Sequence, residues 1–244
     1  FAFTSPDGQL NAFKVLLEEN QRVKQFGFQE GELDRARKSL LAGLERQYND
    51  RDKMESGRLL GEYIRNYLED EPIPGIEAEF EMYKEFLPEI TLDEINALIK
   101  RFIHEDNRVI IFTGPDKEGV EPVTEDQVRA VLEEVESAEI TAYEDEAVAE
   151  TMIADMPAKG SIVSTSENKE VGSVTMELSN GAKVTYKKTD FKNDEIAFQA
   201  YSPGGISLYT DEEILATTFA NGGLTSAGIG GFSLNDLSKF MSGK

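Results

Sequence analysis

The chain has 244 residues, of which 39% are hydrophobic, and carries a formal charge of −22 and no cysteine. A charge this negative argues against nucleic acid and anionic membrane surfaces as partners, because both are bound through clusters of lysine and arginine. The lack of cysteine excludes disulfides, thiolate nucleophiles and metal sites with cysteine ligands. No run of 18 or more apolar residues occurs, so we expect no membrane insertion.

Apolar residues before residue 140 recur mainly at helical spacing. The predicted elements, in chain order, are a strand at 1–4, helices around 13–23, 33–48, 57–68, 76–87 and 92–102, a buried strand at 109–112 and a helix around 128–135. The clearest is the helix from Leu33 to Tyr48, whose Leu40, Leu41 and Leu44 we place in the core. Thr91 and Thr124 are each followed three residues later by Glu or Gln, the capping-box pattern.

The next stretch, 141–173, is weakly periodic and acidic, which predicts an interdomain linker. From Phe112 to Glu170 there are 16 acidic residues against four basic ones. Charge runs of this kind are typical of solvated faces and linkers, and attraction for basic peptides is the alternative interpretation.

After residue 173 the apolar period changes to two, which indicates strands. The runs 174–178 and 182–186 flank Asn180-Gly181, the strongest short signal for a hairpin. A third strand at 196–200, a helix at 211–219 and a glycine-rich stretch at 222–231 follow. We interpret the glycines as a flexible connection or a place of close backbone packing. Three strands and one helix make a poor core, so this second region is expected to be truncated.

No complete catalytic constellation is present in the sequence. His104 is the only histidine, and Arg108 stands four residues after it, so neither HExxH nor HxxEH occurs there. One histidine cannot build a histidine-rich zinc site, and no credible serine triad can be drawn around it. The glycine-rich stretch lacks the ending of a phosphate-binding P-loop. We therefore assign no catalytic residue and no metal ligand, and we interpret His104 as a surface residue at a helix end.

Two groups of motifs resemble a known family. The first group begins with FGFQEGELDRARK at Phe26–Lys38 and continues through 40–46, 72–75, 90–94 and 108–115. The second consists of LSNGAKVTY at 178–186 and AYSPGGISL at 200–208. In this order, and on two sides of a linker, they resemble the M16 family of zinc peptidases (insulinase or pitrilysin-like) in its long bacterial form. The chain is similar to an interior fragment spanning the end of the first half and the start of the second.

The resemblance implies an α+β fold in which helices pack on an antiparallel sheet. Residues 1–140 would be the C-terminal domain of the first half, incomplete at its N-terminus, 141–173 the acidic linker, and 174–244 the truncated start of a degenerate second repeat. Family members bind zinc through HxxEH, whose glutamate acts as general base on the metal-bound water. That domain is expected upstream of Phe1. The corresponding helix of the second repeat falls at Asp211–Ala220, which has no histidine, so no zinc ligand of the family can be transferred.

Three hypotheses about function remain open at this point. The leading one is a non-catalytic central portion of an M16-like zinc metalloendopeptidase, which forms chamber wall and contacts unfolded peptide substrate. Its partners would be that peptide and the missing upstream and downstream domains of the same chain, with zinc in the full-length protein and no cofactor in this chain. The alternatives are a non-peptidase M16 homologue serving as scaffold or peptide-binding subunit, and an unrelated α+β protein. The resemblance favours a periplasmic location, whereas substrate preference, substrate-contact residues and oligomeric state are not determined.

Overall fold

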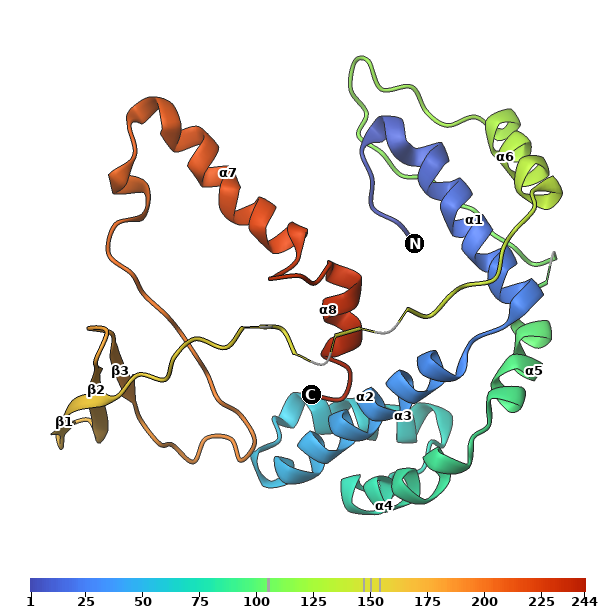
Figure 1. Ribbon diagram of the computed structural model, residues 1–244. Helices are drawn as coiled ribbons and strands as arrows, with labels where there is room; N and C mark the ends of the chain where they lie inside the picture. The colour runs from blue at the N-terminus through green and yellow to red at the C-terminus, as the bar shows by residue number, and fades with distance from the viewer. Residues whose placement is uncertain (105, 147, 150, 154) are drawn as a thin grey trace. The chain divides into compact units, whose positions relative to one another are not determined.

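The computed structural model describes residues 1–104, 106–146, 148–149, 151–153 and 155–244. It divides into two compact units, the first made of 1–37 and 85–147 and the second of 38–84 and 148–244. Each unit is therefore built from two separate stretches of the chain. Helices and one small antiparallel sheet occur together, so the expected α+β class is confirmed (Figure 1). Among the described residues, no helix has the length and apolar character needed to cross a membrane.

The helices expected before residue 140 are all present. The elements, in chain order, are α1 (Gln9–Phe26), α2 (Glu30–Asn49), α3 (Ser56–Glu69), α4 (Ile76–Phe86), α5 (Leu92–Phe102), α6 (Glu125–Ser137), β1 (Ile162–Asn168), β2 (Ser173–Leu178), β3 (Lys183–Tyr186), α7 (Asp211–Ala227) and α8 (Leu234–Phe240). The capping boxes predicted at Thr91 and Thr124 are formed, at the starts of α5 and α6. Hydrogen bonds from the backbone and hydroxyl of Thr91 lower the pKa of Glu94, which keeps that carboxylate ionised at the positive end of α5.

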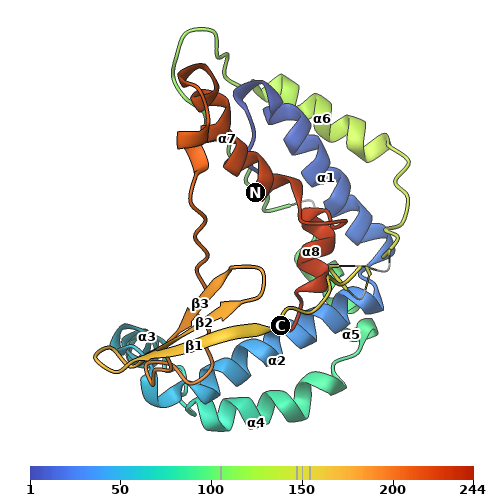
Figure 2. The same cartoon turned by 60° about the vertical axis from the view of Figure 1, so that its left-hand side comes forward.

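In the first unit, α1 packs lengthwise against α6, as both views show (Figures 1 and 2). Phe13 on the inner face of α1 is buried, and its ring meets that of Phe112 edge to face at a centroid distance of 5.4 Å. Val135 of α6 is 4% exposed and belongs to the same unit. Each of the two packed helices thus buries an apolar side chain, Phe13 on α1 and Val135 on α6.

The beginning of the predicted linker is held by side chains of the first unit. Arg22 donates a hydrogen bond to the carbonyl oxygen of Thr141, and Gln29 donates one to that of Tyr143. Arg35 forms two parallel bonds with Asp145, at 2.8 and 3.0 Å. Further along, residues 147, 150 and 154 of the predicted linker lie outside the described residues. The domain limits read from the sequence stay a prediction.

The sheet of the second unit is built around the predicted hairpin (Figure 2). β2 and β3 pair antiparallel, with Val174 opposite Tyr186, and Gly181 takes a φ of 85° in the turn. This positive φ explains the glycine, because other residues are strained there. The third strand is β1, which pairs antiparallel with β2 and lies in the stretch 162–168 that the sequence assigned to the linker. Every residue of β1 is exposed.

Three predicted strands were wrong. In the described chain, residues 1–4, 109–112 and 196–200 have no strand structure. Most of their apolar side chains are open to solvent, as the exposed fractions of 82% for Val109 and 94% for Ile196 show, whereas Ile110 and Phe112 are partly buried. A strand needs a neighbouring strand for its ladder of hydrogen bonds, whereas alternating side chains show only that a segment is suited to pairing.

The C-terminal part of the chain differs from its prediction in two ways. α7 continues to Ala227 and so takes in the first part of the glycine-rich stretch, and α8 was not expected. At Gly228, with φ 93°, a Cβ would lie 2.0 Å from the carbonyl oxygen of Phe232. Close backbone packing therefore accounts for this glycine. In the same segment, the rings of Phe232 and Phe240 meet edge to face at a centroid distance of 5.2 Å.

Limited digestion with trypsin is expected to cut first after Lys159. This residue is exposed and outside any helix or strand, so the protease can bind its backbone in an extended conformation. The lysines and arginines of α2 lie in a regular helix and should be cut later. Mass spectrometry of early fragments provides the measurement, and first cuts within 33–48 would contradict the expectation.

Candidate functional site

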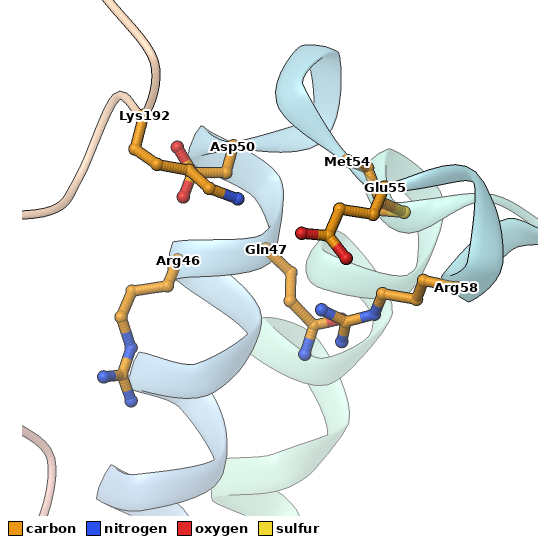
Figure 3. A pocket seen from close by; sticks show the side chains of 7 residues that line it. All are labelled: Arg46, Gln47, Asp50, Met54, Glu55, Arg58 and Lys192. Atoms are coloured by element: carbon orange, nitrogen blue, oxygen red, sulfur yellow. The ribbon is translucent and has the colours of Figure 1, made fainter. Parts of the chain in front are cut away.

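A polar pocket of about 220 Å³ opens in the second unit, between the end of α2, the start of α3 and the loop after β3 (Figure 3). Its lining residues are Arg46, Gln47, Asp50, Met54, Glu55, Arg58 and Lys192. The three cations come from three different elements, and two carboxylates accompany them. A second pocket of about 270 Å³ shares Gln47 and Arg58 with the first and continues along α3.

The side of the pocket that carries Lys192 depends on a loop that is docked on the end of α2. We call residues 190–194 the docked loop. The backbone amide of Asn193 donates to Asp50 Oδ1 at 2.6 Å, and its side-chain amide donates to the Asn49 carbonyl at 2.7 Å and to Asp52 Oδ1 at 2.9 Å. Lys53 Nζ adds a bond of 2.6 Å to the carbonyl of Asp190. These bonds hold Lys192, which is half-buried, at the edge of the pocket.

The cations of the pocket form no ion pairs with carboxylates among the described residues, whereas other arginines nearby do. Arg51 pairs with Glu77 at 3.0 Å and Arg65 with Glu71 at 2.8 Å. Within the described residues, no ion pair involves any of the pocket's cations. Arg46 Nε donates only to the Ala42 carbonyl, at 3.3 Å. Figure 3 shows Arg58 directed toward Gln47. The pocket therefore offers guanidinium and ammonium groups that are available to an anion.

The two places considered as sites in the sequence belong to different units. His104 is exposed and follows α5, whereas residues 211–220 lie in α7. Over the part of the chain that the structure describes, no three His, Asp or Glu side chains are arranged to hold a metal ion. The assignment of no catalytic residue and no metal ligand stays a prediction. Sequence reasoning missed the pocket because Lys192 is distant in sequence from α2 and α3, and no motif marks it.

Comparison with known proteins relates the chain to proteases. No family model matches the sequence. The chain is 32% identical over 204 residues to a zinc protease PQQL-like protein of Arabidopsis thaliana, in a match that covers 82% of this chain and 21% of the relative. The crystal structure of the periplasmic protease PqqL from Escherichia coli matches with a TM-score of 0.47 and 17% identity, over 94% of this chain and 25% of that chain.

The helices and the small antiparallel sheet define an α+β protein, and the sequence identity relates it to zinc proteases. The resemblance indicated by the motifs is confirmed by this identity, and the chain is an M16-like segment. It spans about a fifth of the length of the curated relative that it matches.

Proposed function

We propose that the chain is the non-catalytic central portion of an M16-like zinc metalloendopeptidase. It forms chamber wall and contacts peptide substrate, while the zinc-binding HxxEH domain lies upstream in the longer protein. The observation that carries this proposal is the 32% sequence identity to a zinc protease. The match covers 21% of the length of that protease, which supports the role of a portion of a longer protein. The other domains of the same protein are its partners, the zinc belongs to the full-length protein, and the family resemblance favours the periplasm as its location.

An exposed apolar face on α3 supports the contacts that this role requires. Leu60, Tyr63, Ile64 and Tyr67 follow the spacing i, i+3, i+4, i+7, which places them on one side of the helix. Their exposed fractions are 56, 54, 47 and 86%. Apolar patches of this kind mark surfaces that bind another protein segment. In the proposed role, a peptide or a neighbouring domain covers this face.

The chain by itself is expected to retain no zinc and to cleave no peptide. It offers one histidine and no cysteine, and carboxylates alone are poor ligands for a structural zinc ion. Elemental analysis of dialysed, tag-free protein and a chelator-controlled assay on unfolded peptides provide the measurements. Stoichiometric zinc, or cleavage that a chelator stops, would place a metal site in this chain and contradict the non-catalytic role.

The longer protein provides the direct test. Its sequence upstream of Phe1 should contain HxxEH, and the purified protein should bind one zinc ion and cleave unfolded peptides in a chelator-sensitive manner. Replacing the glutamate of that motif by glutamine should abolish cleavage while zinc stays bound, because this residue serves as the general base. Absence of the motif and of activity would instead favour a non-peptidase M16 homologue that acts as scaffold or peptide-binding subunit.

A further inference from the structure

We propose that the pocket between α2, α3 and the docked loop binds a carboxylate group of a peptide. The carboxylate part of this inference rests on the pocket itself, and the peptide part rests on the proposed function. The carboxylate belongs either to the C-terminus of the peptide or to an acidic side chain, and both present the same planar anion.

The balance of charge in the pocket favours an anion with a single charge. Three cations and two carboxylates line it, so its net charge is about one positive unit in a chain of −22. The carboxylates of Asp50 and Glu55 would repel a phosphate, which carries up to two charges. A guanidinium group such as that of Arg58 matches the two oxygens of a carboxylate with two parallel N–H donors. The chemistry therefore selects a carboxylate.

The size of the pocket sets how much of a ligand it can take. A volume of about 220 Å³ is below the range of roughly 300–1,000 Å³ that is typical of sites enclosing a whole small molecule. One residue of a peptide fits this space better than a complete ligand would. The side chain of Met54 supplies an apolar part of the lining next to the charged groups, as an amino-acid residue with an aliphatic portion requires.

The docked loop completes the site. Lys192 reaches the pocket because the neighbouring Asn193 is hydrogen-bonded to the chain at and just after the end of α2. Its backbone amide binds Asp50, and its side-chain amide binds Asn49 and Asp52. The backbone amide of Asn193 also donates to one oxygen of Asp50, which reduces the ability of that carboxylate to neutralise Lys192. Removing the Asn193 side chain deletes its bonds to Asn49 and Asp52, which hold the docked loop, and should therefore weaken ligand binding even though that side chain does not line the pocket.

Titration of the ¹⁵N-labelled chain with three short peptides tests the proposal. The probes are acetyl-Ala-Ala-Ala with a free C-terminus, acetyl-Ala-Glu-Ala-amide and the neutral acetyl-Ala-Gln-Ala-amide. We expect amide shifts confined to residues 46–58 and 190–194 with the free C-terminus, with the glutamate peptide or with both, and none with the neutral peptide. Binding of only one of the first two identifies the source of the carboxylate. The shifts should weaken as salt is raised, because the groups are exposed.

Substitutions of the pocket residues should change the affinity for the carboxylate peptides in predictable directions. Arg58→Ala and Lys192→Ala should each weaken binding by about two- to fivefold, the range for exposed ion pairs. Glu55→Gln should tighten binding, because it removes a repelling carboxylate. Exposed cations outside the pocket serve as matched controls, and Arg101→Ala and Lys188→Ala should leave binding unchanged. The amide spectrum of each variant shows whether it is folded.

Three results would overturn the proposal. They are the absence of shifts at the pocket with both carboxylate peptides, equal binding of the neutral peptide, and unchanged binding in Arg58→Ala together with Lys192→Ala. None of these bears on the proposed function, whose own test is chelator-sensitive cleavage by the longer protein. If that cleavage is absent while the carboxylate peptides bind here, the pocket stands and the peptidase role fails.

Discussion

Replacing Leu44 by alanine is expected to lower the free energy of unfolding by about 2–5 kcal/mol, the usual cost of leaving a cavity in a packed core. Leu44 is 7% exposed and lies on the apolar face of α2, one turn before Tyr48. The ring of Tyr48 stacks on that of Phe80 of α4 at 5.1 Å, so this face of α2 holds helices of the second unit together. Thermal and urea unfolding, followed by circular dichroism, measure the loss, and the melting temperature should fall by several degrees.

Two substitutions provide controls for this result. Leu40 lies one turn earlier on the same helix and is 44% exposed, so its predicted place in the core was wrong. Leu40→Ala should therefore cost clearly less than Leu44→Ala. His104 is exposed, and His104→Ala should leave the melting temperature almost unchanged. If His104→Ala were the costlier of the two, the ranking of these residues would be wrong, and His104 would need a role that its surface position does not provide.

Asp145→Ala is expected to cost about 1–3 kcal/mol, because it leaves a partly buried guanidinium group without its carboxylate. The side chains of Arg35 and Asp145 are 24% and 14% exposed, and their two bonds are 2.8 and 3.0 Å long. The hydrogen bond with Asp145 raises the pKa of Arg35 above its ordinary value, against the opposing effect of burial. Chemical denaturation measures the loss, and cleavage by proteases within 141–146 should increase at the same time.

An exposed ion pair on α6 is the matched control for this second result. Arg129 and Glu125 are 68% and 75% exposed, so Arg129→Ala should change stability by less than about 0.5 kcal/mol. A cost for Asp145→Ala as small as that of Arg129→Ala would show that residues 141–146 are not held by Arg35. The start of the predicted linker would then behave as free chain, as the acidic composition alone suggests.

The candidate pocket could not be predicted from the sequence. Arg46, Arg58 and Lys192 are ordinary surface residues in the sequence, and no spacing between them indicates that they meet. Lys192 joins the other two because Asn193 binds the end of α2, and a bond between residues so far apart in the chain leaves no periodic signal. The family resemblance did not indicate the pocket either, since its motifs include Arg46 but neither Arg58 nor Lys192.

Sequence by itself determined the helices before residue 140, the start of α7 and the hairpin of this protein, whereas the full length of α7, the presence of α8 and the other contacts appeared only in the tertiary structure. An α-helix forms bonds between residues four apart, and a capping box such as Thr91–Glu94 closes within one turn, so local residues are sufficient. Asn180-Gly181 likewise determines a turn between adjacent strands. Whether 109–112 or 162–168 becomes a strand depends on a partner elsewhere in the chain, and only the second has one, in β2. Burial of Leu44 and exposure of Leu40 depend in the same way on which remote segment packs against α2, because a helical stripe shows which face is apolar but not how far its partner extends.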